Sequence, residues 1–325
     1  MGASGPDAIL ALARGFQESR VLLTGAELDL FTLLAHEALT VDEIAARSGA
    51  DDRALTVVLD ALAAMELLSK IGGRYRTAPE AAALSADAPD SVLPVLLHSA
   101  ALWHRWTELT RMAGGTPIPD RRPEESLHAF IGAMHVLAVP QADRIVAEAG
   151  VGGARRLLDV GAGPGTFTIA FLRAEPALSA TLFDRPAVVE IARGHFARAG
   201  LDGRVSFVAG DFDTDELPGG HDLVWLSAVI HQNDSRANDA LYDRVYRALV
   251  PGGRLVLRDF VMEPGRTRPR AGALFAVNML VGTADGGTYT FEEIEAGLSR
   301  AGFERVRLLA AGERMDGLVE AFRPV

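Results

Sequence analysis

The chain has 325 residues, of which 49% are hydrophobic and 23% charged, and its formal net charge at pH 7 is −11. This length predicts roughly two domains, and the acidic balance argues against nucleic acid as a partner, because its binders neutralise phosphates with clustered Lys and Arg. The absence of cysteine excludes disulfides, thiol nucleophiles and cysteine-bound zinc. No apolar run reaches about 18 residues and no basic-then-apolar leader opens the chain, so we expect a cytoplasmic protein without a membrane partner.

Residues 1–85 predict a helical domain with one small hairpin. Thr40 and Glu43 form a capping box, the signature of a helix start. Gly72-Gly73 marks a tight turn between two short strands, and helix-turn-helix followed by such a wing is a winged-helix module, which often binds DNA. Here the second helix is acidic and apolar nearly all round, so we expect it to be buried and to act as a scaffold. The expected elements are helices at 41–48 and about 53–68 and strands at 68–71 and 74–77.

Two helical stretches, at 91–112 and 127–148, follow this domain. Both are apolar beyond one stripe, and a helix of that kind must bury more than one face. Together with apolar segments at 9–12 and 21–34, they predict a subunit interface and hence a homodimer. The alternative is a well-packed monomer in which these helices lie across the catalytic domain.

From residue 155 to the end, strands and helices alternate, which predicts a mainly parallel sheet. The last strand could insert antiparallel at the edge of that sheet. The expected strands lie at 157–160, 180–183, 205–211, 222–226, 254–258, 305–309 and 317–322, and the expected helices at 167–172, 238–249 and 291–301.

Three glycines, Gly161, Gly163 and Gly165, follow the first of these strands. Glycine permits a tight turn and lets a ligand approach the backbone. The dinucleotide fingerprint is G-x-G-x-x-G, but here the third glycine comes one residue early, and Asp159 stands two positions before the first. This pattern resembles motif I of the S-adenosylmethionine (SAM) methyltransferases; the alternative is a turn that serves tight packing only.

Acidic residues also end the next two strands. Asp184 stands where α/β nucleotide sites place the carboxylate that accepts hydrogen bonds from the ribose hydroxyls. Asp211, followed by Phe212, ends the third strand; in SAM enzymes such an acid accepts from the adenine amino group and its neighbour covers the ring. One such carboxylate is usually a turn or helix cap, but three consecutive strands ending in acids favour a shared site.

Over about residues 10–323 the chain resembles the SAM-dependent O-methyltransferases of plant and bacterial small-molecule pathways. The signatures, in order, are Gly-Ala-Glu-Leu-Asp-Leu-Phe31, Asp-Val-Gly-Ala-Gly-Pro-Gly165, Gly-Asp-Phe212, Ile-His231 and Pro-Gly-Gly-Arg-Leu-Val-Leu-Arg-Asp259. The resemblance implies an α/β fold with a doubly wound, mainly parallel SAM-methyltransferase sheet and an N-terminal helical winged-helix dimerisation domain. The implied parts are a dimerisation domain at 1–85, a helical linker at 86–150 contributing to the substrate pocket and the dimer, and a SAM-binding domain at 151–325.

By the same resemblance, His231 is the general base for a hydroxyl acceptor and Asp259 holds its distal ring nitrogen. A phenol has a pKa of about 10 and is mostly protonated at neutral pH, so an imidazole in hydrogen-bond reach accelerates the reaction by removing its proton. The implied SAM-binding residues are Gly161, Gly163, Asp184, Asp211, Phe212 and Ser227. The implied acceptor pocket contains Phe130, Met134, His135, Asn278 and Met279, with Phe275 and Trp103 as further candidates.

The chain departs from the family pattern at three places. The usual His-Asp-Trp-Ser-Asp run reads His231-Gln-Asn-Asp-Ser, a second family carboxylate aligns with Thr288, and the lysine that often precedes the histidine by four residues is Ser227. These departures keep open a relative that binds SAM but performs other chemistry, such as hydroxylation or decarboxylation; a SAM-sensing transcription factor is a third hypothesis. We expect no metal, since Asp259 and Asp234 are the only evident carboxylate candidates beside the histidine.

Overall fold

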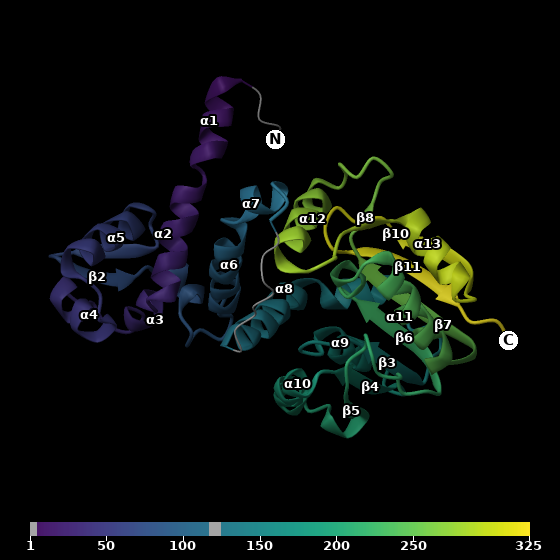
Figure 1. Ribbon diagram of the computed structural model, residues 1–325. Coiled ribbons are helices and arrows are strands. Elements are labelled where there is room, and N and C mark those ends of the chain that lie inside the picture. Colours follow the sequence, from purple (N-terminus) through teal and green to yellow (C-terminus); the bar gives the residue numbers. More distant parts are fainter. Residues whose placement is uncertain (1–4, 117–124) are drawn as a thin grey trace. The chain divides into compact units, whose positions relative to one another are not determined.

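The computed structural model describes residues 5–116 and 125–325, which form two compact units (Figure 1). The first unit contains the described residues up to 104 together with 125–136, and the second contains 105–116 and 137–325. Within the described residues, no helix is long and apolar enough to cross a membrane.

The first unit contains the predicted capping box. The Thr40 hydroxyl accepts the Glu43 N–H at 3.3 Å, and the Glu43 carboxylate accepts the Thr40 N–H at 2.8 Å, which confirms the predicted helix start. The second helix, predicted at about 53–68, ends at Ala64, because Glu66 takes a positive φ of 60° and turns the chain into the hairpin. The elements are α1 (Pro6–Arg14), α2 (Phe16–Glu27), α3 (Leu30–Leu33), α4 (Val41–Ser48), α5 (Asp52–Ala64), β1 (Leu68–Ile71), β2 (Arg74–Thr77) and η1 (Pro79–Leu84).

Helix α5 is amphipathic in this structure. Leu55, Leu59 and Leu62 are buried in the core of the first unit, while Val57 is 64% exposed. The expectation that this helix is buried nearly all round is therefore wrong for the single chain, because the buried positions form one helical stripe.

The two long helical stretches differ from each other. The stretch predicted at 91–112 is interrupted by a turn at Thr107 and Glu108, and the stretch predicted at 127–148 is a single helix that contains Pro140. The bounds are α6 (Leu93–Trp106), α7 (Leu109–Ala113) and α8 (Glu125–Ala149).

The second unit is built on a seven-stranded sheet with the order β10-β11-β7-β6-β3-β4-β5. The five strands from β7 to β5 are parallel, as predicted. The last strand, β11, does insert antiparallel, but it lies between β7 and β10, so β10 and not β11 forms that edge. The strands are β3 (Arg156–Val160), β4 (Ser179–Asp184), β5 (Val205–Ala209), β6 (His221–Ser227), β7 (Leu249–Asp259), β10 (Glu304–Ala310) and β11 (Gly317–Phe322).

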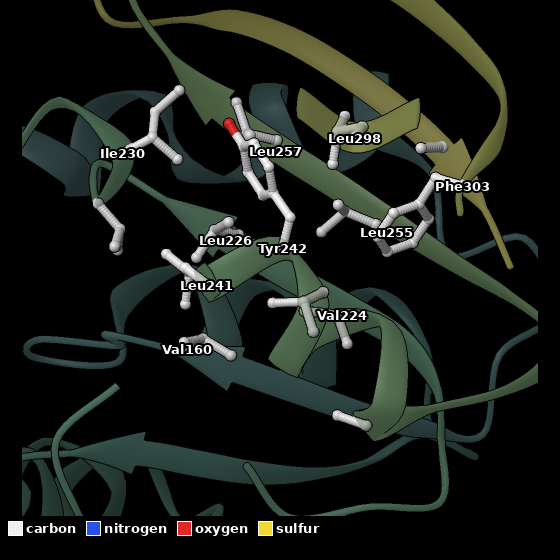
Figure 2. Packing of buried hydrophobic residues seen from close by; sticks show 14 of the residues in the cluster. Val160, Val224, Leu226, Ile230, Leu241, Tyr242, Leu255, Leu257, Leu298 and Phe303 are labelled. Carbon is white, nitrogen blue, oxygen red and sulfur yellow. The ribbon is translucent and has the colours of Figure 1, made fainter. Parts of the chain in front are cut away.

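Helices cover both faces of this sheet (Figure 1). On one face α11 and α13 pack against the strands, and Figure 2 shows Tyr242 of α11 beside Leu255 and Leu257 of β7. On the other face lie α9, α10 and the end of α8. A sheet covered on both faces requires strands that are apolar throughout, which is why β3, β6 and β7 read as nearly continuous apolar runs. The helices are α9 (Thr166–Ala174), α10 (Pro186–Ala199), α11 (Ser235–Ala248) and α13 (Phe291–Arg300), with the short turns η2 (Asp202–Arg204) and η3 (Ile230–Gln232).

Some elements of this unit were placed differently or not at all by the sequence. Helix α11 starts at Ser235, three residues before the predicted start, because the Asp234 carboxylate caps it by accepting the Ala237 N–H at 2.7 Å. A helix, α12 (Arg270–Gly282), and a two-stranded parallel pair, β8 (Val261–Met262) with β9 (Tyr289–Thr290), had no counterpart among the predicted elements.

Candidate active site

The glycine turn after β3 combines tight packing with an open backbone. Gly161, Gly163 and Gly165 all have positive φ, between 55° and 72°. A Cβ on Gly161 would come within 2.8 Å of the Val229 side chain, and one on Gly165 within 2.4 Å of Phe196. At Gly163, in contrast, no atom of the described chain lies within 4 Å of the Cβ position. The outer glycines are thus needed for packing, and the middle one leaves room for a ligand at the backbone.

Asp184, at the end of β4, points its carboxylate at this turn. Its Oδ2 accepts the Gly163 N–H at 2.8 Å, and its Oδ1 accepts the Arg185 N–H at 2.7 Å. Burial raises the pKa of Asp184, and these two backbone hydrogen bonds oppose that rise. Since each carboxylate oxygen has two acceptor positions, Asp184 keeps the capacity to accept from a pair of ligand hydroxyls.

Asp159 acts within the protein. Its carboxylate is buried and accepts the hydroxyl of Thr168, which joins β3 to α9. Burial raises the pKa of Asp159 to about 7. Asp159 therefore stabilises the glycine turn by linking the strand before it to the helix after it.

Asp211 and Phe212 differ in how they relate to the turn. The ring of Phe212 lies 3.3 Å from the position that a Gly161 Cβ would take, so it borders the cradle. Asp211 is exposed, and its Oδ1 accepts the Asp213 N–H at 2.9 Å. The turn-capping role that is common for such acids is therefore present at Asp211, and a role in adenine binding stays a prediction.

The structure brings His231 and Asp259 together. His231 lies in η3, just after β6, and its Nδ1 is 2.9 Å from each carboxylate oxygen of Asp259 at the end of β7. Both side chains are buried, and Asp259 also accepts the Phe260 N–H at 2.8 Å. The Phe275 ring meets the imidazole edge-on at a centroid distance of 4.8 Å. Because a carboxylate accepts hydrogen bonds, Nδ1 carries the proton and Nε2 has the free lone pair of the neutral ring.

Backbone contacts hold His231 in place. The Asn238 side-chain amide donates to the Ile230 carbonyl at 2.9 Å, and the Gly287 N–H donates to the His231 carbonyl at 2.9 Å. A Cβ on Gly286 would come within 2.5 Å of that carbonyl, which explains the glycine at position 286. Thr288, which replaces the second family carboxylate, is buried after them, so Asp259 is the one ion-pair partner of His231 in the described chain.

Ser227, at the end of β6, contacts Arg258, a residue with no role predicted from the sequence. Its hydroxyl accepts from Nη1 of Arg258 at 2.9 Å, and the two residues are paired in register between β6 and β7. The signal that could have identified Arg258 is a charged residue inside the apolar run of a buried strand, where unpaired charges are rare.

The predicted acceptor residues are divided between the two units. Asn278 and Met279 belong to α12 in the second unit, where the Trp106 indole N–H donates to Oδ1 of Asn278 at 3.1 Å. The other three, Phe130, Met134 and His135, belong to the first unit, and Trp103 lies there too. Their part in an acceptor pocket stays a prediction.

Among residues 5–116 and 125–325 there is no group of three or more His, Asp or Glu side chains placed to hold a metal ion. Asp234, one of the two candidate carboxylates, caps α11.

The open backbone at Gly163 and the carboxylate of Asp184 fit a ligand that carries a nucleoside. The His231–Asp259 pair adds a proton acceptor at the same edge of the sheet. This fold and this site define the class of SAM-dependent methyltransferases. Residues 119–304 match the O-methyltransferase domain and residues 10–87 match the O-methyltransferase dimerisation domain. The chain belongs to this family and is a SAM-dependent O-methyltransferase.

Individual relatives support the assignment. The chain is 34% identical to the 3-hydroxy-5-methyl-1-naphthoate 3-O-methyltransferase of Streptomyces sahachiroi, over 93% of this chain and 90% of that protein. It is 31% identical to the tetracenomycin polyketide synthesis 8-O-methyl transferase of Streptomyces glaucescens, over 94% of each. The crystal structure of human N-acetylserotonin methyltransferase in complex with SAM matches with a TM-score of 0.80 at 26% identity, covering all of both chains.

Proposed function

We propose that this enzyme methylates a hydroxyl of a phenolic or polyketide-like small metabolite, with His231 as general base and Asp259 as the residue that positions it. The observation that carries the proposal is the buried contact between Nδ1 of His231 and the Asp259 carboxylate, 2.9 Å to each oxygen. The names of two relatives, one a naphthoate and one a tetracenomycin polyketide O-methyltransferase, support the acceptor class.

The chemistry requires a proton acceptor and alignment. SAM, when bound, would supply the methyl group of its sulfonium to the acceptor oxygen, with the S–CH₃ bond breaking and S-adenosylhomocysteine as the leaving group. With Nδ1 bonded to Asp259, Nε2 of His231 takes the hydroxyl proton as the new bond forms, an effect worth roughly 10²–10⁴ in rate. The carboxylate fixes the ring tautomer and stabilises the imidazolium, as the third member of a triad does.

We propose that the cofactor is held by the glycine turn, Asp184, Asp211, Phe212 and Ser227. The open backbone at Gly163 and the partly satisfied carboxylate of Asp184 support this assignment. For the acceptor, Met suits a flat aromatic ligand because its thioether is adaptable, and Asn278 has amide N–H groups to donate. The acceptor residues are Phe130, Met134, His135, Asn278 and Met279.

We further propose that the chain forms a homodimer through its N-terminal part. The proposed domains are 1–85, 86–150 and 151–325. We also propose a cytoplasmic location and no nucleic-acid partner. Helix α1 has no buried residue in the single chain, and its apolar Ile9, Leu10 and Leu12 are 50–67% exposed. Such patches are rarely left open. Light scattering should give a dimer, Leu12→Asp should weaken it, and a monodisperse full-length monomer would contradict the proposal.

The function is tested by a screen with methyl-labelled SAM over hydroxynaphthoates, other phenols and aromatic polyketides. We expect label transfer to an oxygen, lost in His231→Ala, with turnover that survives EDTA because imidazole replaces a Lewis acid. Reversible loss of activity with EDTA would remove the metal-independent mechanism. Consumption of SAM without a methylated product, or full turnover by His231→Ala, would favour a different chemistry.

A further inference from the structure

Arg258 is a buried cation with few hydrogen bonds. It is 5% exposed, and the guanidinium has five N–H donors. Within the described ranges its one hydrogen bond goes to the Ser227 hydroxyl, its buried Nε has no partner, and no carboxylate lies within ion-pair distance. Arg254, four residues earlier on the same strand, is different: it bonds Glu320 and two backbone carbonyls at 2.7–2.8 Å.

A buried guanidinium with so few hydrogen bonds destabilises the fold unless an anionic partner binds it. A buried charge without a partner is strongly disfavoured, and buried charges in proteins are normally paired. Burial lowers the pKa of Arg258 to about 10, so it stays charged at neutral pH, with Asp259 and Asp316 as the attracting charges nearby and Arg144 opposing. The ring of Phe167, 4.6 Å from the guanidinium carbon, covers one face of the cation.

The position of Arg258 is at the cofactor edge. Ser227 ends β6, and Phe167 is the second residue of α9, directly after the glycine turn. In the sheet, β3 lies between β6 on one side and β4, which carries Asp184, on the other. Two strand spacings, roughly 10 Å, therefore separate the strand of Asp184 from the strand of Ser227, whose hydroxyl accepts from Arg258 on the next strand, β7.

We propose that Arg258, assisted by Ser227, binds the carboxylate of the methionine portion of SAM. With its ribose at Asp184 and its adenine at Asp211 and Phe212, which follow β5, SAM would have its amino-acid end on the β3 and β6 side of Asp184. That end carries a carboxylate, the anionic partner that Arg258 lacks. A guanidinium binds a carboxylate through two parallel N–H groups. This inference rests on the SAM dependence of the enzyme and adds the residue that distinguishes SAM from analogues without the carboxylate.

The test is calorimetric binding to the full-length protein of SAM, S-adenosylhomocysteine and decarboxylated SAM, which lacks only the carboxylate. Wild type should prefer SAM over decarboxylated SAM by roughly 10- to 100-fold. Arg258→Met should abolish this preference while leaving the affinity for decarboxylated SAM unchanged. The matched control Arg254→Met changes an arginine on the same face of the same strand and should leave the preference unchanged, whatever it does to stability.

Two results would overturn the inference: equal binding of SAM and decarboxylated SAM by wild type, or an equal loss of both in Arg258→Met, which would mean a structural role only. If Arg258→Met does not fold, Arg258→Lys decides, since it keeps the charge but loses the paired N–H groups; its preference should fall several-fold, and an unchanged preference refutes the inference. Wild type that binds neither ligand would overturn the cofactor assignment together with it.

Discussion

The substitution Asp259→Asn tests the base most directly because it changes charge with almost no change in shape. The carboxylate lies 2.9 Å from Nδ1 of His231 through both oxygens and also accepts the Phe260 N–H. An asparagine can keep the bond to Phe260 with its oxygen, but its NH₂ group then faces Nδ1. The imidazole then favours the tautomer with its proton on Nε2, and the fraction of enzyme whose Nε2 has a lone pair for the acceptor proton falls.

The expected size of the effect follows from the lost interaction. A hydrogen bond to a charged group is worth about 1.5–3 kcal/mol, which corresponds to a fall in the methyl-transfer rate of roughly 10- to 150-fold. His231→Ala removes the base itself, so its loss should be larger, roughly 10²–10⁴. The assay is single-turnover transfer from labelled SAM at saturating acceptor, with SAM affinity measured separately by calorimetry and expected to stay within about twofold in both variants.

The double variant gives the decisive comparison. If Asp259 acts only through His231, adding Asp259→Asn to His231→Ala should cause no further loss, since residues that act as a unit are not additive. Full turnover by Asp259→Asn, or multiplied losses in the double variant, would refute the reasoning.

Three further outcomes are expected. Asp184→Ala should weaken SAM binding by about 1–3 kcal/mol, and unchanged affinity in calorimetry would remove Asp184 from the site. Burial raises the pKa of Asp159 to about 7, so the stability that its protonated carboxyl contributes is present at low pH and is lost as the pH rises through 7. Relative to wild type, the unfolding free energy of Asp159→Asn should therefore increase between about pH 4 and 7, by up to about 4 kcal/mol. Parallel pH profiles of the two proteins in urea titrations would contradict this. Gly165→Ala should destabilise the protein by about 1–3 kcal/mol more than Gly163→Ala, because only the former meets a side chain within 2.4 Å; equal midpoints of unfolding would count against the packing account.

The sequence predicted the site edge well because parallel strands place their carboxyl ends together. Asp184 and Asp259 end β4 and β7, and His231 follows β6, as the strand runs predicted, whereas the contact between His231 and Asp259 was implied by the family resemblance. The capping box at Thr40 was equally predictable, since its hydrogen bonds depend on residues three apart.

Other features depend on contacts between distant segments and could not be read from local patterns. The position of β11 between β7 and β10 is decided by which edges meet in the folded sheet. The partner of Ser227 is an arginine 31 positions away on the neighbouring strand. A strand-end acid such as Asp211 looks the same in sequence whether or not its carboxylate accepts a backbone N–H of its own turn, as Asp211 does from Asp213.

Strand β7 carries Arg258 and Asp259 next to each other in sequence but on opposite faces of the sheet. Arg258 lies against Phe167 on the α9 side, and Asp259 reaches His231 on the other. Because side chains alternate with a period of two, one inserted or deleted residue within β7 would exchange the two charges between the faces. The length of this strand should therefore be kept in any redesign. Helix α12, which begins 11 residues beyond Asp259 at Arg270, carries two of the proposed acceptor residues and is the segment in which to vary acceptor preference, with Phe275 kept because its ring contacts His231.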